Sequence, residues 1–286
     1  MEQPAISELF TRWEIPALPT IFLLAMALIY VIGWARAHET RPAELPLWRL
    51  IAFLSGLGAL FVAISSPLDT FGESLLFMHM AQHFVLMSIA PPLLALGAPV
   101  VPLLRGMPRF AVHMLRPLFR SRAVQGLLRH SKRILFAWLA MNFTYMSWHI
   151  PAAYELALSS ENWHNVEHIC FLSTSMLFWW PVVQPWPFRR AESQWLLVPY
   201  LVGSDLVNTG ISAYLCFCGR LVYSSYANVE RPFSLNPLTD QIAAGAFMWV
   251  FGSMVFLIPV AAIILRALSP QMLGCAVAKH AREGVA

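Results

Sequence analysis

The stretch FMHMAQHFVLMSIAPPLLALGAP, residues 77–99, decides the fold class of this protein. It is apolar enough to lie in a lipid bilayer, yet it carries two histidines four residues apart and the consecutive prolines Pro91 and Pro92. A hydrocarbon layer about 30 Å thick needs roughly 20 apolar residues of helix to cross it. The stretch therefore predicts a transmembrane helix whose ionisable side chains must face the interior of a bundle rather than lipid.

The rest of the chain has the composition of a membrane protein. Of its 286 residues, 58% are hydrophobic and 12% are charged, and the mean hydropathy is +0.60. Soluble domains carry about 25% charged residues. We therefore expect an all-α integral membrane bundle that forms a single domain over residues 1–286. Seven transmembrane helices are predicted, at residues 18–35, 48–65, 75–104, 133–148, 164–183, 194–217 and 238–265.

The basic residues predict how the bundle is oriented. Sixteen of the 19 lysines and arginines lie after the first, third, fifth and seventh predicted helices. The alternate segments hold only Arg12, Arg220 and Arg231. Because cytoplasmic loops are enriched in Lys and Arg, we expect the amino terminus outside and the carboxyl terminus in the cytoplasm. The same distribution accounts for the net charge of +4, so no nucleic-acid partner is expected.

Five of the nine histidines are predicted to meet near the outer face of the membrane. His79 and His83 lie near the outer end of the third predicted helix, His149 follows the fourth, and His164 and His168 begin the fifth. Residues four apart share one face of a helix, with Cβ atoms about 5–6 Å apart, so each pair is suited to bind a metal ion. Ionisable residues inside a membrane are functional candidates by default.

Methionines near these histidines indicate the kind of metal. Met80 and Met87 lie beside the first pair, and Met248 lies in the seventh predicted helix. Thioether and imidazole donors favour Cu(I), whereas carboxylate-rich sites favour harder ions. Met87 and Met248 are secondary candidates. The predicted copper ligands are His79, His83, His149, His164, His168 and Met80.

Pro91 is expected to bend the third helix just below the histidines. A proline has no N–H to donate to the carbonyl of Met87 one turn back, and its ring clashes with that carbonyl. The bend would free backbone carbonyls and open a pocket. A kink that merely fits neighbouring helices is an equally good interpretation.

Further polar residues are weaker candidates. Asp240 begins the seventh helix next to Gln241, where its carboxylate can stabilise a helix amino terminus or hydrogen-bond a metal-bound imidazole. Cys216 and Cys218 end the sixth helix, but residues two apart point in nearly opposite directions and can share an ion only where the helix unwinds. Asp205 lies deep in that helix, either as a hydrogen-bonded acid or as a step in a proton or ion path.

Several blocks of the sequence carry a family likeness. They are HMAQHFVLMSIAPPLLALGAP, WHIPAAYELAL, HNVEHICFL with FWWPVV, and NPLTDQIAAGAFMWVFG. In this order they resemble the CtaG family of cytochrome c oxidase assembly factors, the kind that serves caa-type oxidases. The resemblance covers roughly residues 45–265, and the cysteine pair is not part of the family pattern. The likeness includes His79, Met80, His83, His149, His164, His168, Asp240 and Gln241.

The resemblance implies a multi-pass protein of the bacterial cytoplasmic (inner) membrane that is needed to make an active haem-copper oxidase by handling copper. A protein of this kind is a carrier or chaperone and not an enzyme. The expected partners are oxidase subunits, an extracytoplasmic copper chaperone and the lipid membrane. Whether the protein forms a homo-oligomer stays open.

Two other functions fit parts of the pattern. Paired histidines on separate helices can hold haem b in an electron-transfer protein or reductase. Two pairs with a spacing of four suit a small ion better, and the sequence has no nicotinamide or flavin fingerprint. A metal-dependent intramembrane hydrolase would need Glu161 or Glu167 as its base, and no HExxH motif occurs. The copper-binding assembly factor is the leading hypothesis.

Overall fold

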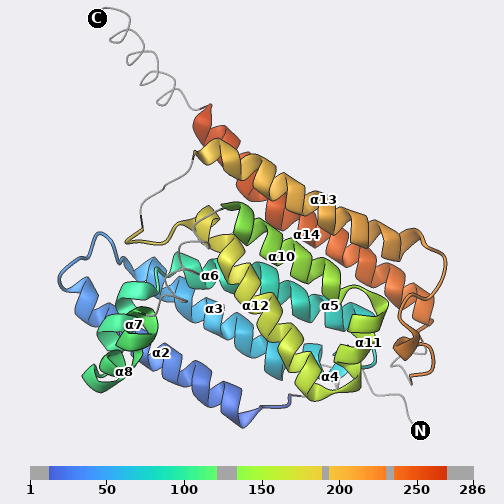
Figure 1. Cartoon of the computed structure of the whole chain (residues 1–286), viewed down its shortest axis with the longest axis horizontal. Helices are drawn as coiled ribbons and strands as arrows, with labels where there is room; N and C mark the ends of the chain where they lie inside the picture. Colours follow the sequence, from blue (N-terminus) through green and yellow to red (C-terminus); the bar gives the residue numbers. More distant parts are fainter. Residues whose placement is uncertain (1–12, 121–133, 189–192, 230–234, 269–286) are drawn as a thin grey trace, which may run out of the picture.

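The protein is a bundle of long helices, and no strand occurs in the part of the chain that the structure describes (Figure 1). The structure is a computed structural model, and it describes residues 13–120, 134–188, 193–229 and 235–268. Within these described ranges, five helical stretches are long and apolar enough to cross a membrane. They are α2 (Ala17–His38), α3 (Leu47–Ser65), the stretch Leu76–Leu96, α12 (Glu161–Val183) and α14 (Pro237–Ala267). The prediction of an all-α fold with several membrane-spanning helices is confirmed.

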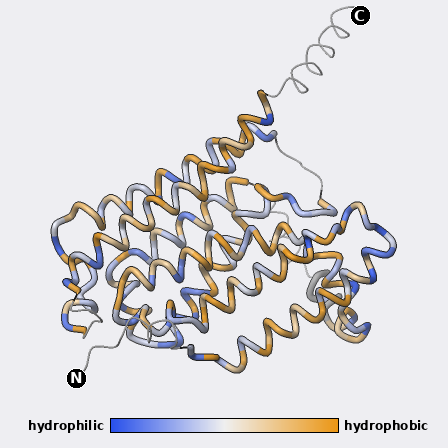
Figure 2. The backbone as a smooth tube through the Cα atoms, turned by 180° about the vertical axis from the view of Figure 1, so that it is seen from behind, coloured by the Kyte–Doolittle hydropathy of each residue, from blue (hydrophilic) through white to orange (hydrophobic). Residues whose placement is uncertain are grey.

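The outward-facing side chains are apolar, as a lipid environment requires. Leu18, Phe143, Phe217 and Ile258 are all among the exposed large hydrophobic residues. Hydrophobic residues dominate the long helices, and hydrophilic residues lie mainly in the connecting segments at either end (Figure 2). A helix that is hydrophobic all round belongs in a membrane or in the core of a large protein.

Two further helices occupy the remaining predicted ranges. These are α10 (Ile134–Trp148) and α13 (Leu197–Phe217), the latter preceded by a short 3₁₀ turn at Gln194–Leu196. Helix α13 runs side by side with α14, and α10 packs against α12 and α13 (Figure 1). Helix α3 packs against α2 and against the second half of the Leu76–Leu96 stretch. Each of the seven predicted ranges is therefore mainly helical within the described residues.

The stretch that decides the fold class forms one bent helix. It consists of α5 (Leu76–Phe84), a π-helical turn η1 (Val85–Ile89) and α6 (Ala90–Leu96). Pro91 lies just after the π turn, and Trp179 Nε1 donates a hydrogen bond of 2.9 Å to the carbonyl of Met87. The helix is thus irregular where Pro91 predicted a bend, and a side chain from α12 satisfies the carbonyl for which Pro91 has no N–H.

The third predicted helix ends earlier than expected, at Leu96 instead of residue 104. The chain turns at Ala98, whose φ is 48°, and continues as α7 (Val100–Gly106), which packs against α2. A Cβ atom on Gly33 would overlap the carbonyl oxygen of Pro102, so the two backbones approach very closely. Because the apolar composition continues through α7, hydropathy alone does not reveal this turn.

Short elements close the end of the bundle at which α5 and α12 begin and α10 ends. They are α4 (Pro67–Gly72), α11 (Pro151–Ser159) and the 3₁₀ turn η3 (Ser224–Tyr226). We call this the histidine end, because His79, His149 and His164 all lie there. Helices α7 and α8 (Arg109–Arg120) lie away from it, at the other end of the bundle (Figure 1).

Candidate metal centre

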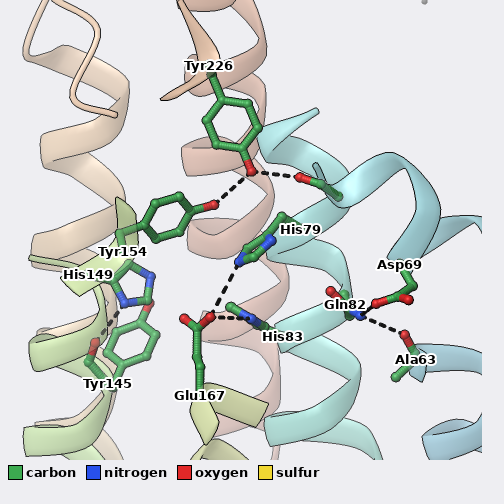
Figure 3. Close-up of polar contacts among 11 residues, drawn as sticks. Ala63, Asp69, His79, Gln82, His83, Tyr145, His149, Tyr154, Glu167 and Tyr226 are labelled. Atoms are coloured by element: carbon green, nitrogen blue, oxygen red, sulfur yellow. Dashed lines mark hydrogen bonds and ion pairs between the residues drawn. The ribbon is translucent and has the colours of Figure 1, made fainter. Parts of the chain in front are cut away.

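Four side chains from two helices converge at the histidine end. One donor atom from each of His79, His83, His164 and Glu167 lies within 4.8 Å of the other three. Glu167 Oε2 is 4.0 Å from His79 Nε2 and 3.8 Å from His83 Nε2 (Figure 3). His79, His83 and Glu167 are buried, and His164 is partly exposed. We call these four residues the His/Glu cluster.

Helical spacing explains how each helix presents its donors. His79 and His83 lie four apart on α5, and their ring centroids are 4.2 Å apart. On α12, Glu167 and His168 follow His164 by three and four residues, which places all three on one face. His168 lies beside the cluster, 4.1 Å from His164 and 5.4 Å from His83 between ring centroids. The structure thus brings both predicted histidine pairs together.

Glu167 is the ligand candidate that the sequence reasoning missed. From the sequence alone, Glu167 is named only as the possible base of a hydrolase. Its position three residues after His164 was the available signal, since residues three apart share a helix face. The Glu167 side chain is 1% exposed and extends from α12 toward the two α5 histidines (Figure 3).

The donor set fits a metal ion because its polar atoms lack other partners. Among the described residues, nine buried nitrogen and oxygen atoms here make no hydrogen bond. They are Nδ1 and Nε2 of His79 and His83, Nε2 of His149, His164 and His168, and both Glu167 oxygens. Buried polar groups are nearly always satisfied, and each unsatisfied one costs about 1–3 kcal/mol. Coordination to a shared ion would remove that cost.

His149 lies next to the cluster and has one nitrogen available as a ligand. Its Nδ1 is 2.7 Å from the carbonyl oxygen of Tyr145. A carbonyl can only accept, so Nδ1 carries the proton and Nε2 keeps its lone pair. This arrangement is common for metal-binding histidines, in which a second hydrogen bond orients the ring. His149 is not one of the four clustered residues.

Three tyrosines cover the cluster at the histidine end, and sequence reasoning did not find them. The Tyr154 ring lies 5.1 Å from His79, and Tyr223 stacks on Tyr154 at 3.9 Å between centroids. Tyr154 and Tyr226 are joined through their hydroxyls at 3.0 Å, and Tyr226 also donates to the Gly72 carbonyl (Figure 3). Tyr154 lies on the short helix α11, and Tyr223 and Tyr226 lie in and beside the turn η3, so no periodic pattern marks the three together in the sequence.

The loop that carries Tyr223 and Tyr226 is attached to α11. Glu155 accepts hydrogen bonds from the backbone N–H of Ser224, at 2.9 Å, and from the Ser224 hydroxyl. These bonds favour the charged carboxylate and hold the pKa of Glu155 below its usual value. The tyrosine cover is therefore held by side-chain and backbone contacts at the histidine end.

Asp240 lies in the first turn of α14, but its carboxylate stabilises the amino terminus of another helix, α5. Its carboxylate accepts hydrogen bonds from the N–H groups of Leu76, at 2.7 Å, and Phe77, at 3.2 Å. The neighbouring Gln241 holds the turn after α13: Nε2 donates to the Leu215 carbonyl and Oε1 accepts from the N–H of Val222. Both residues position the elements around the cluster.

The cysteine candidates lie apart from the cluster. The Cys216 thiol is 3.6 Å from the carbonyl oxygen of Ile242, and the Cys218 thiol is 3.1 Å from that of Arg220. Within the described ranges, neither belongs to a metal-capable group with the histidines. Asp205 is partly buried, has one buried oxygen without a hydrogen bond in the described structure, and is also outside the cluster.

The predicted methionine ligands gather in a cavity beside the cluster. Met80, Met87 and Met248 line this cavity together with His83 and His149. The predicted imidazole and thioether donors therefore lie in the His/Glu cluster, beside it and around this cavity, and His83 is common to the cluster and the cavity.

Most of the chain, including the His/Glu cluster, matches one known protein family. A profile of the cytochrome c oxidase caa3 assembly factor family, CtaG, matches residues 28–269. The chain belongs to this family. The match contains every residue of the His/Glu cluster and both residues of the Asp240–Gln241 pair. The CtaG resemblance seen in the sequence blocks is confirmed.

The CtaG match extends to curated mycobacterial proteins. Uncharacterised proteins of Mycobacterium bovis and Mycobacterium tuberculosis are each 26% identical over 272 residues, which is 92% of this chain and 40% of each relative. An uncharacterised protein of Mycobacterium leprae is 27% identical over 269 residues, covering 87% of this chain and 38% of the relative. The chain spans about 40% of the length of these relatives. No solved structure matches the chain.

Proposed function

We propose that this CtaG family member is a membrane assembly factor that binds copper as cargo at the His/Glu cluster and delivers it to a haem-copper cytochrome c oxidase. The observation that carries the proposal is the convergence of three imidazoles and one carboxylate within 4.8 Å, largely buried. The family supplies the biological setting, because its members are cytochrome c oxidase assembly factors. An assembly factor has a non-catalytic role.

Copper is favoured over other metals by the donors in and beside the cluster. Imidazole suits zinc, copper, iron and nickel, and divalent copper forms the most stable complexes in this series. The methionines around His83 add soft donors that favour Cu(I). A haem b function has less support, because four donors gathered within 4.8 Å surround the space of an ion rather than the two faces of a porphyrin.

Acidic residues at the histidine end support the binding of a cation. The carboxylates of Glu73 and Glu161 interact electrostatically with His164, the partly exposed member of the cluster. Asp69 lies within electrostatic range of Glu161 and Glu14. Surface regions of one sign concentrate ions of the opposite sign. The carboxylates would therefore attract a metal cation to the partly exposed side of the His/Glu cluster, near His164.

The proposed orientation places the histidine end outside the bacterial cytoplasmic membrane. It combines the five apolar helical stretches with α10 and α13 as seven spans. Sixteen of the 19 basic residues then lie on the cytoplasmic side. An extracytoplasmic copper chaperone would reach the cluster without crossing the hydrocarbon layer.

Topology reporters test this orientation. A reporter fused after Arg120 should behave as cytoplasmic, and one fused after Ser159 should behave as external, because the two positions lie on opposite sides of α10. Green fluorescent protein and alkaline phosphatase fusions report the two sides. Equal signals at both positions would contradict the seven-span topology.

Metal content tests the cluster. Protein purified under reducing conditions should contain copper as its main transition metal and should show no Soret band. Glu167→Gln keeps the shape of the side chain but removes the anionic ligand, and we expect copper affinity to fall by about tenfold or more. Glu155→Gln is the matched control, because Glu155 lies on the loop contact at the same end. Undiminished copper in Glu167→Gln, measured by mass spectrometry, would remove the cluster as the site.

A further inference from the structure

A second group of soft donors lies next to the His/Glu cluster. A cavity of about 50 Å³ between α5, η1, α10, α13 and α14 is lined by methionines, with His83 and His149 beside them. The methionines are Met80, Met87, Met141 and Met248, and each is 6% exposed or less. Met141 was not a candidate from the sequence. We call this space the methionine cavity.

The side-chain nitrogens of the two asparagines that line the methionine cavity already donate hydrogen bonds. Asn142 Nδ2 donates to the carbonyl of Trp138 and to the Ser204 hydroxyl. Asn208 donates to the carbonyl of Met248, and its Oδ1 accepts from Tyr145 at 2.9 Å. These groups position the helices around the cavity and do not serve as free ligands.

The donors that remain are soft or borderline. Both ring nitrogens of His83 and Nε2 of His149 are buried without a hydrogen-bond partner among the described residues. Of the described residues that line the cavity, none is Asp or Glu. Thioether sulfur and imidazole nitrogen are therefore the metal-binding donors of this lining, in which the other polar groups are uncharged hydroxyls and amides. His83 is 4% exposed.

We infer that the methionine cavity is a second metal site, which binds a soft monovalent cation such as Cu(I) and adjoins the His/Glu cluster through His83. Thioether and imidazole donors select Cu(I) over hard or divalent ions. A single water needs about 10–15 Å³, so about 50 Å³ holds an ion, whereas pockets for organic ligands are several times larger. Methionine side chains are flexible enough to adjust around the ion.

The π-helical turn η1 contributes two residues, Met87 and Ser88, to the lining of this cavity. Met87 belongs to the π-helical turn η1, and π turns widen a helix locally and often occur at functional sites. Trp179 bonds to the Met87 carbonyl, while the Met87 side chain lines the cavity. The bend that Pro91 requires thus coincides with the placement of a thioether donor beside His83.

Two imidazoles line the methionine cavity, and each also belongs to a neighbouring site. His83 belongs to both the cavity and the His/Glu cluster. His149 lines both the cavity and a wider pocket of about 310 Å³ that also includes Met146 and Tyr223. The methionine cavity thus shares one imidazole with the His/Glu cluster and one with the wider pocket. The biological identity of the ion as copper rests on the proposed function, but the affinity of the cavity for a soft cation does not.

Two metal probes separate the sites in one protein. Co(II), followed by its visible absorption, reports the His/Glu cluster, and Ag(I), followed by calorimetry, reports soft donors. The four cysteines, Cys170, Cys216, Cys218 and Cys275, are first replaced by Ala so that thiols do not bind silver. The variants are Met141→Leu with Met248→Leu, and Glu167→Gln. Met176→Leu is the control, because Met176 lies against another core cluster.

The methionine double variant should weaken Ag(I) binding by about tenfold or more and leave the Co(II) spectrum unchanged. Leucine nearly conserves the volume of methionine, and an intact Co(II) spectrum shows that the fold is preserved. Glu167→Gln should weaken Co(II) binding and leave Ag(I) binding unchanged. Ag(I) affinity that is unchanged in the double variant, or that is lost in Glu167→Gln, would overturn the second site. Methionine-dependent Ag(I) binding in a protein that fails to bind Co(II) would reject the His/Glu cluster and still support the cavity.

Discussion

Replacing His83 by Ala should leave the protein inserted in the membrane but leave the cytochrome c oxidase inactive. His83 has the largest expected effect because it belongs to the His/Glu cluster and also lines the methionine cavity. Loss of one ligand group should lower metal affinity by about tenfold to a hundredfold or more. The truncation removes little packing relative to the many helix contacts that hold a membrane bundle.

The measurement compares oxidase activity, haem spectrum and copper content in membranes that carry wild type, His83→Ala or a deletion. His113→Ala is the control, because His113 is an exposed histidine of α8 at the other end of the bundle. Added copper should partly restore activity to His83→Ala, since mass action refills a weakened site. A fully active, copper-replete oxidase beside a stable His83→Ala protein would instead support a scaffold that handles no copper.

Replacing Asp240 by Ala should destabilise the protein strongly. The Asp240 carboxylate is 2% exposed and accepts the N–H groups of Leu76 and Phe77 at the start of α5. Hydrogen bonds to a charged group contribute about 1.5–3 kcal/mol each, and their loss leaves two buried donors unsatisfied. We expect a cost of about 3 kcal/mol or more. The stability of Asp240→Asn should lie between those of wild type and Asp240→Ala, because an amide has one acceptor oxygen in place of two.

Thermal unfolding in detergent, followed by size-exclusion chromatography, measures this loss. Asn236→Ala is a matched control on the same helix, because Asn236 caps α14 itself through the N–H of Leu238 at an exposed position. Loss of an ordinary helix cap costs about 1 kcal/mol. The Asp240→Ala protein should therefore unfold at a clearly lower temperature than Asn236→Ala. Equal unfolding temperatures would show that the bonds from Asp240 to α5 contribute little.

The sequence determined the features that depend on local order along the chain. Apolar runs predicted the helical ranges, because the length needed to cross a bilayer follows from the helical rise. The spacing of four predicted that His79 and His83 share one face, and that His164 and His168 share another. The proline at position 91 predicted the bend, because a proline lacks the N–H that a straight helix requires. Each of these features is set by residues within a few positions of one another.

Only the tertiary structure decided which faces meet. The packing of α12 against η1 and α6 brings the Glu167 carboxylate to His79 and His83, although the sequence motifs pointed to Met80 as the nearby ligand. The packing of α14 against α5 lets Asp240 cap a helix that begins 164 positions earlier in the chain. Close approach of α2 and α7 turns the chain after Leu96. Helical periodicity states which residues share a face, but the contacts between helices depend on side-chain shape at positions far apart in sequence.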